Sequence, residues 1–315
     1  MIKVGGLREL PRVRDVFQRA RYAPRIETPI SDSYYPEVAE RRGAPRAPLH
    51  FRRIELKYFI PYRHIDHFVE RISRHTDVDP YLVKEGKGRT RYPVTSLYFD
   101  SYDLMAWAEK ENGQFYRRKI RLRTYDEEFS TESPVFMEIK RRLDAVVLKD
   151  RIGLPAGVLK ADMSPRRLLP YLLAQAERQD ATALEAQMML GWLNLQPTAI
   201  VKYQRMALVA KEDPNMRITV DHHIQGVWRP SSILGTVPMR HVDNINATGM
   251  NGIGGKYALL ELKSNGGIPG WLHEAVQDME LNRTAYSKYY LVVMALRPEI
   301  LEDCDDRFDT KEMEP

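Results

Sequence analysis

The fold is decided by a stretch that reads Arg117-Arg118-Lys119-Ile120-Arg121-Leu122-Arg123. Side chains alternate between the two faces of a β-strand, so residues 117, 119, 121 and 123 would place four cations on one face. Such a row weakens strand pairing unless an anion or carboxylates lie among the cations. The stretch therefore predicts a strand that lines an anion-binding site.

A second pattern, in which glutamate and lysine stand two residues apart, occurs three times in segments that also read as strands. The copies are Glu55-Leu56-Lys57, Glu138-Ile139-Lys140 and Glu261-Leu262-Lys263. Each Glu and Lys would share one face of its strand. The glutamates either pair with the lysines or supply the hard oxygen ligands that Mg²⁺ or Mn²⁺ prefers, and Glu261 is the best single candidate for a metal ligand.

Many expected strands follow one another with short connections, which favours antiparallel pairing. The strands are expected at 51–60, 93–100, 114–125, 134–142, 145–152, 197–210, 216–221 and 257–264. Helices are expected at 63–74, 104–110, from 164 towards 193 in two pieces, 269–279 and 287–295. Because the second sheet face is crowded with Arg, Lys and Glu, a closed barrel with a charged lumen is favoured. We expect an α+β fold, an antiparallel eight-stranded β-barrel with flanking helices.

Charge is unevenly distributed along the 315 residues, whose net charge is +5. Residues 1–50 hold nine Arg and one Lys against six acids, so the rest of the chain is nearly neutral. A local anion site is therefore favoured over a generally basic surface. We expect three parts: a flexible Arg- and Pro-rich arm (1–50), a folded domain (51–298) and an acidic tail (299–315). Part of the arm could instead form an amphipathic helix that docks on a partner or membrane.

Other features narrow the class of protein. The one cysteine, Cys304, allows neither a disulfide nor a Cys-based zinc site within the chain, which favours a reducing compartment. No signal peptide and no stretch of ~18–20 apolar residues is present, so we expect a cytoplasmic protein that reaches a membrane only through a partner. His222 and His223 are expected to be surface or core residues. Glycines 252, 254 and 255 precede a strand, which argues against a nucleotide-binding loop.

Eight short motifs in series resemble the VTC (vacuolar transporter chaperone) domain, the polyphosphate polymerase branch of the CYTH-like triphosphate tunnel metalloenzymes. They cover about 245 residues of the chain and come in the order expected for that domain. The motifs are Arg53-Ile54-Glu55-Leu56-Lys57-Tyr58, Ser96-Leu97-Tyr98-Phe99-Asp100, Arg118-Lys119-Ile120-Arg121-Leu122-Arg123-Thr124-Tyr125, Phe136-Met137-Glu138-Ile139-Lys140, Lys202-Tyr203-Gln204-Arg205, Arg217-Ile218-Thr219-Val220-Asp221, Leu260-Glu261-Leu262-Lys263 and Tyr286-Ser287-Lys288. Arg53 departs from the Glu-x-Glu-x-Lys strand of hydrolytic tunnel enzymes, which favours the polymerase branch.

The resemblance implies a tunnel open at both ends, in which ATP and polyphosphate or triphosphate bind with Mn²⁺ or Mg²⁺. The catalytic residues that it implies are Lys57, Arg121, Arg123, Lys140, Arg205 and Arg217. The implied phosphate-binding residues are Lys149, Tyr203, Lys263, Ser287 and Lys288. The candidate metal ligands are Glu261, Glu138 and Glu55.

Three alternatives to a polymerase remain at this stage. The same tunnel could hydrolyse tripolyphosphate or nucleoside triphosphates, or a non-catalytic module could bind and sense polyphosphate. Specific nucleic-acid binding is less favoured, because no aromatic stacking pattern of an RNA-binding module is present. Export of a polyphosphate product would need a membrane-protein partner.

Overall fold

The computed structural model describes residues 54–80, 82, 90–143, 146–155, 157–161, 163–175, 181–243 and 255–297. The predicted arm (1–50), the predicted acidic tail (299–315), Arg53 and Cys304 lie outside these ranges.

Within these ranges ten strands form one sheet, and all pairs of named strands are antiparallel. Eight of them follow one another in the order β1-β10-β8-β7-β3-β4-β5-β6. These strands are β1 (Ile54–Pro61), β3 (Tyr92–Asp100), β4 (Tyr116–Thr124), β5 (Phe136–Leu143), β6 (Val146–Gly153), β7 (Gln196–Ala210), β8 (Arg217–Trp228) and β10 (Tyr257–Ser264). Two short strands extend the sheet: β2 (Thr76–Val78) pairs with β7, and β9 (Arg240–His241) pairs with β8.

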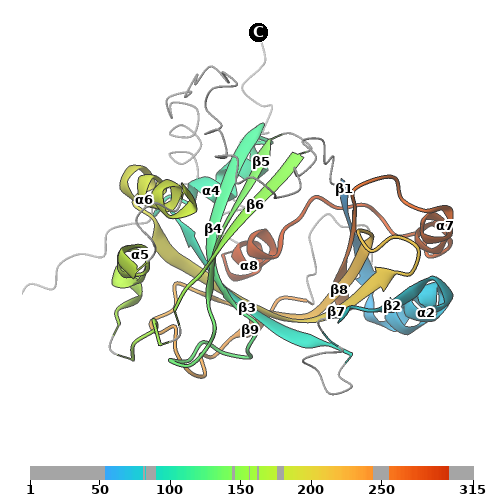
Figure 1. Ribbon diagram of the computed structural model, residues 1–315, viewed down its shortest axis with the longest axis horizontal. Helices are drawn as coiled ribbons and strands as arrows, with labels where there is room; N and C mark the ends of the chain where they lie inside the picture. The colour runs from blue at the N-terminus through green and yellow to red at the C-terminus, as the bar shows by residue number, and fades with distance from the viewer. Residues whose placement is uncertain are drawn as a thin grey trace, which may run out of the picture.

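Six α-helices of the described residues flank the curved sheet on its two faces (Figure 1). They are α2 (Tyr62–Ile72), α4 (Met105–Glu111), α5 (Pro165–Gln175), α6 (Ala181–Leu193), α7 (Gly270–Asp278) and α8 (Lys288–Leu296), and a 3₁₀ turn at Ser73–His75 follows α2. The α+β class, the antiparallel sheet and its eight-strand path are confirmed. The prediction of a closed barrel is wrong for the described residues, because β1 and β6 end the path without pairing with each other.

Three apolar clusters hold the helices against the sheet. The sheet curves into two wings. The wing that contains β3, β4 and β5 packs its outer face on α5 and α6 through residues such as Ile120 and Leu168. The wing that contains β1, β8 and β10 packs its outer face on α2 and α7 through Phe68 and Leu272. The third cluster lies on the concave face, where α8 packs against β7 and β8. These two outer layers and the inner helix leave the rest of the concave face to polar residues.

Helix α8 lies between the two wings of the sheet (Figure 1). Its sequence, residues 288–296, is apolar on nearly every side, which is typical of a helix buried all round. The helix fits closely because β8 has a glycine at the contact: a Cβ built on Gly226 would lie 2.5 Å from Val292 Cγ1. Helix α8 therefore fills part of the concave face, where the resemblance implied a passage open at both ends. The helix also carries Lys288 to the polar part of that face.

Replacing Gly226 by alanine is expected to lower the free energy of unfolding by about 1–3 kcal/mol, because the added methyl group overpacks the α8 contact. Urea denaturation measures this change. Gly266→Ala is the matched control, since a Cβ there meets no atom within 4 Å. Adding Val292→Ala to Gly226→Ala should restore part of the loss, and equal effects at the two glycines would contradict the packing argument.

Candidate phosphate-binding site

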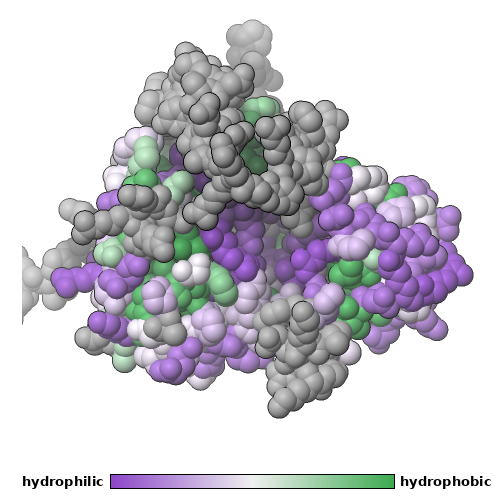
Figure 2. Space-filling view, viewed as in Figure 1, coloured by the Kyte–Doolittle hydropathy of each residue, from purple (hydrophilic) through white to green (hydrophobic). Residues whose placement is uncertain are grey.

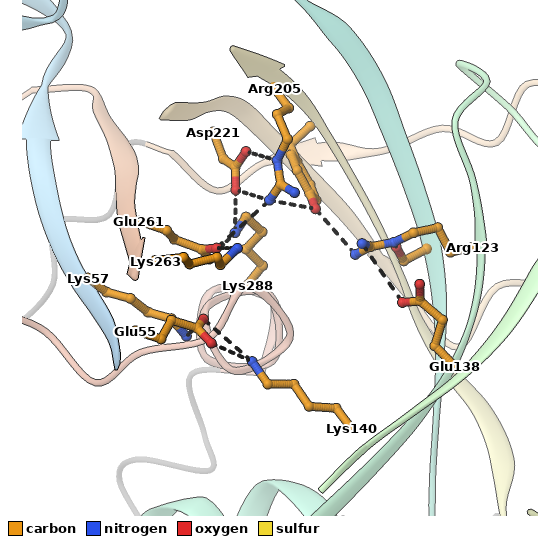
Figure 3. A network of polar contacts seen from close by, with 12 residues as sticks. Glu55, Lys57, Arg123, Glu138, Lys140, Arg205, Asp221, Glu261, Lys263 and Lys288 are labelled. Atoms are coloured by element: carbon orange, nitrogen blue, oxygen red, sulfur yellow. Dashed lines mark hydrogen bonds and ion pairs between the residues drawn. The ribbon is translucent and has the colours of Figure 1, made fainter. Parts of the chain in front are cut away.

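Hydrophilic side chains gather in the hollow between the two wings (Figure 2). They come from the concave face of the strands and from the start of α8, and they form a network of ion pairs (Figure 3). The cations of this network are Lys57, Lys119, Arg121, Arg123, Lys140, Lys149, Arg151, Arg205, Lys263 and Lys288. The carboxylates are Glu55, Glu138, Asp221 and Glu261. Cations outnumber carboxylates, so the face can take up further anions.

Glu138, on β5, is the centre of the first group. Its side chain is fully buried, and its oxygens lie 2.7 Å from Arg121 Nη2, 2.6 Å from Lys149 Nζ and 2.5 Å from Arg151 Nη2. Arg123 Nη1 is 3.8 Å away. Burial alone would raise the pKa of Glu138, but Arg121 and Arg123 hold the pKa well below its usual range. The carboxylate is therefore a fixed anion that arranges four cations from β4 and β6.

A second group lies on β7, β8, β10 and α8. Arg205 forms a bidentate pair with Asp221, at 2.6 Å and 2.7 Å. Lys288 Nζ lies 2.5 Å from Asp221 Oδ2 and 2.7 Å from Glu261 Oε1, and Lys263 Nζ lies 2.7 Å from Glu261 Oε2. Burial opposes the charged forms, yet these contacts hold the pKa of both carboxylates below the usual range and raise the pKa of Lys288. Asp221, Glu261, Arg205 and Lys288 are therefore charged at neutral pH.

The hydroxyl of Tyr203 connects the two groups, and those of Ser96 and Tyr98 hold arginines of the first group. Tyr203 Oη lies 3.3 Å from Arg123 Nη2 and 3.4 Å from Arg205 Nη2, so one hydroxyl receives hydrogen bonds from both groups. Ser96 Oγ accepts a hydrogen bond from Arg123, and Tyr98 Oη accepts one from Arg121 at 2.9 Å. The guanidinium groups are thereby held in place before any ligand binds, as preorganised electrostatic sites require.

The third group joins β1, at one end of the strand path, to β5, which lies next to the other end. Glu55 on β1 lies 3.4 Å from Lys57 Nζ and 3.2 Å from Lys140 Nζ, which comes from β5. Ion pairs thus cross the interval between β1 and β5. Burial alone would raise the pKa of Glu55, but Lys140 and Lys57 lower it.

Four lysines of the site, Lys263 among them, have pKa values that burial depresses. Burial lowers the pKa of Lys119 to about 7, of Lys149 to about 7 and of Lys140 to about 8; nearby carboxylates offset only part of this effect. Lys119 also faces other lysines, and its Nζ lies 3.4 Å from Ser287 Oγ at the start of α8. A bound polyanion would raise these pKa values, because it favours the charged form of each lysine.

The structure brings most of the residues predicted for the site together on the concave face. The residues in these groups are Lys57, Arg121, Arg123, Lys140, Arg205, Lys149, Tyr203, Lys263, Ser287, Lys288, Glu261, Glu138 and Glu55. Arg217, at the start of β8, lies in register with Lys263 of β10, but its side chain is 44% exposed and pairs with Asp79.

Two charged residues of the network, Asp221 and Arg151, were not among the predicted site residues, whereas Lys119 was predicted on the anion-facing side of its strand without a role of its own. Strand alternation signals Arg151 as well, since it shares a face with Lys149. Asp221 gave a weaker signal, a lone acid at the end of the Arg217 motif. Its role depends on Arg205 and Lys288, which are far away in the sequence.

The model of the VTC domain family matches residues 52–297. The chain belongs to this family. The matched range contains the whole network of the concave face, so the VTC domain of this chain is a polyphosphate-related enzyme acting on phosphate.

Comparison with solved structures adds a similar chain from Hippeastrum, named as an adenylyl cyclase for which a dominant triphosphatase activity is reported. It shares 11% identity and a TM-score of 0.43 with this VTC domain, over 77% of this chain and 95% of that one. A search of curated proteins gave no match. Within the described ranges, no helix is both long enough and apolar enough to cross a membrane.

Proposed function

We propose that this VTC domain is a polyphosphate polymerase, which transfers the terminal phosphoryl group of ATP to the end of a polyphosphate chain. The observation that carries the proposal is the buried, preorganised set of arginines and lysines on the concave face, with carboxylates arranged among them. Arginine binds phosphate oxygens in a bidentate manner and lysine acts as a point charge, so the set suits a chain of phosphates.

The reaction needs alignment and charge neutralisation more than proton transfer. A terminal phosphate oxygen of the polyphosphate attacks the γ-phosphorus, the bond to the bridging oxygen breaks, and ADP leaves with the electron pair. The two substrates would lie along the cations, with Arg205 and Lys288 at one group and Arg121 and Arg123 at the other. Holding both in line supplies much of the rate enhancement in phosphoryl transfer.

The electrostatics of the carboxylates favour transfer to phosphate over hydrolysis. Glu55, Glu138, Asp221 and Glu261 all have a lowered pKa, because cations surround them and outweigh the effect of burial. Such carboxylates are weak bases, poorly suited to take a proton from water. An ionised phosphate acceptor brings no proton to remove, which fits this site.

A divalent cation, Mn²⁺ or Mg²⁺, completes the proposal. The described residues contain no group of three or more His, Cys, Asp or Glu side chains placed to hold a metal. Asp221 and Glu261 nevertheless both contact Lys288 Nζ, so two carboxylates lie close together. Mg²⁺ is commonly held by one or two carboxylates and by substrate phosphates. The donor set therefore fits an ion that arrives with ATP, and this ion would neutralise charge on the phosphate oxygens.

The proposal is tested by incubating the protein with ATP and Mn²⁺ or Mg²⁺ and resolving the products on a gel stained for polyphosphate. We expect a ladder of long chains that requires the metal and is lost in Glu261→Gln. Free orthophosphate without a ladder would assign hydrolysis instead, and tight triphosphate binding without turnover would assign a sensing module. We place the reaction in the cytoplasm, with any export of the product left to a membrane-protein partner.

A further inference from the structure

Strand β8 contains a bulge directly after His222, two residues beyond Asp221. In its pairing with β7, Lys202 is opposite Gln225 and Gln204 is opposite His222. One residue of β7, Tyr203, therefore faces two residues of β8, His223 and Ile224. Two residues against one defines a β-bulge, and bulges re-aim the side chains on either side of them.

Because of this bulge, residues before it and after it on β8 can both face the concave side of the sheet. Before it, Asp221 points to that face and pairs with Arg205. After it, Gly226 lies on the same face beneath Val292 of α8. The two positions are five residues apart, so uninterrupted alternation would put them on opposite faces. The bulge is thus the local device that combines the charged group and the packed helix on one strand.

The bulge requires an unfavourable backbone conformation. His223 has φ +51°, in the left-handed region that glycine adopts freely and that costs other residues free energy. Such a conformation persists only where the surroundings hold it in place. The backbone N–H of His223 donates to Tyr62 Oη at 2.5 Å, and Tyr62 Oη in turn donates to Asp243 Oδ2 at 2.5 Å.

Tyr62 and Asp243 each form a backbone hydrogen bond at the start of β10. The backbone N–H of Tyr62, the first residue of α2, donates to Lys256 O at 3.0 Å, and the N–H of Tyr257 donates to Asp243 O at 2.9 Å. Lys256 directly precedes β10 and Tyr257 is its first residue, and this strand also carries Glu261. The pair therefore ties the bulge to a neighbouring strand of the site.

We propose that Tyr62, held by Asp243, is a positioning residue that keeps the β8 bulge in the shape required for triphosphate binding. It acts through two neighbours of the bulge: Asp221, which pairs with Arg205 and Lys288, and Tyr203, whose hydroxyl lies between Arg123 and Arg205. The inference rests on the proposed function, in that triphosphate is taken as the ligand of the concave face.

The test compares Tyr62→Phe with Tyr58→Phe, which removes a hydroxyl from the outer face of the adjoining strand β1. Tripolyphosphate affinity is measured by calorimetry, and exchange of the His223 amide hydrogen is measured in the free protein. Tyr62→Phe should weaken binding about five- to tenfold, the scale of one lost hydrogen bond, and should quicken the exchange. Tyr58→Phe should change neither.

A second variant separates positioning from a general loss of stability. His223→Gly allows the left-handed conformation without cost, so Tyr62→Phe should lose much less affinity in that background. Unchanged affinity in Tyr62→Phe, an equal loss in Tyr58→Phe, or no relief by His223→Gly would each overturn the inference. If the wild-type protein fails to bind tripolyphosphate, the proposed function fails, and amide exchange still decides whether Tyr62 holds the bulge.

Discussion

Replacing Arg121 by alanine is expected to lower the rate of phosphoryl transfer about 100- to 1000-fold, the scale seen when one preorganised electrostatic donor is removed. Arg121 is 16% exposed in its side chain, and its guanidinium is held by Glu138 and Tyr98. A phosphate group that reaches it meets a donor already in position. The protein should stay folded, because Glu138 keeps Lys149 and Arg151 as partners.

The matched control for Arg121 lies on the same strand. Arg118 is on the opposite face of β4 and is paired in register with Arg141, which binds Glu185 of α6. Arg118→Ala removes an identical charge from the outer face, so the ladder assay should detect near-normal synthesis. Synthesis at wild-type rates in folded Arg121→Ala would remove this arginine from the catalytic set.

Strand alternation explains why much of the network could be predicted from the sequence. Arg121 and Glu138 were placed on the anion-facing side of their strands by counting every second residue, and the structure pairs them at 2.7 Å. The alternation is a local property of an extended chain, so it needs no knowledge of the fold. It cannot show which partner a side chain takes: Arg217, at the start of β8, was grouped with the catalytic residues, whereas its side chain pairs with Asp79.

The features that could not be predicted depend on distant partners. Alternation fails at the bulge in β8, where His223 takes a left-handed conformation that only Gly or Asn would have signalled. The apolar sequence of α8 predicts burial but not its place on the concave face, which depends on the space left at Gly226. Closure of the barrel is likewise a contact between the two ends of the path, and no local pattern specifies it.

Replacing Glu138 by glutamine is expected to give the largest loss of stability in the network, about 3–5 kcal/mol in the free energy of unfolding. The substitution keeps the shape of a fully buried side chain and removes the charge that Arg121, Lys149 and Arg151 share. Those cations would then repel one another in a site of low dielectric constant. Chemical denaturation at neutral pH measures the loss.

Two further measurements identify the cause as a missing counter-ion. Tripolyphosphate should raise the melting temperature of Glu138→Gln more than that of the wild-type protein, since the ligand replaces the lost negative charge. The pKa of Glu138 is lowered on folding, so its contribution is present above the usual pKa of a glutamate and is lost as the pH falls below it. Acidification should therefore destabilise the wild-type protein more steeply than the variant.

The control for Glu138 is Glu127→Gln. Glu127 pairs with Lys202 at 2.6 Å, but its side chain is 57% exposed, so losing this ion pair should change stability by less than about 1 kcal/mol. Both substitutions remove one carboxylate charge, and they differ in burial and in the number of cations left behind. Equal losses in the two variants would mean that the cations of the concave face do not depend on Glu138. A large loss confined to Glu138→Gln and reversed by tripolyphosphate would show that the Glu138 carboxylate balances the charge of these cations and that bound tripolyphosphate can do so in its place.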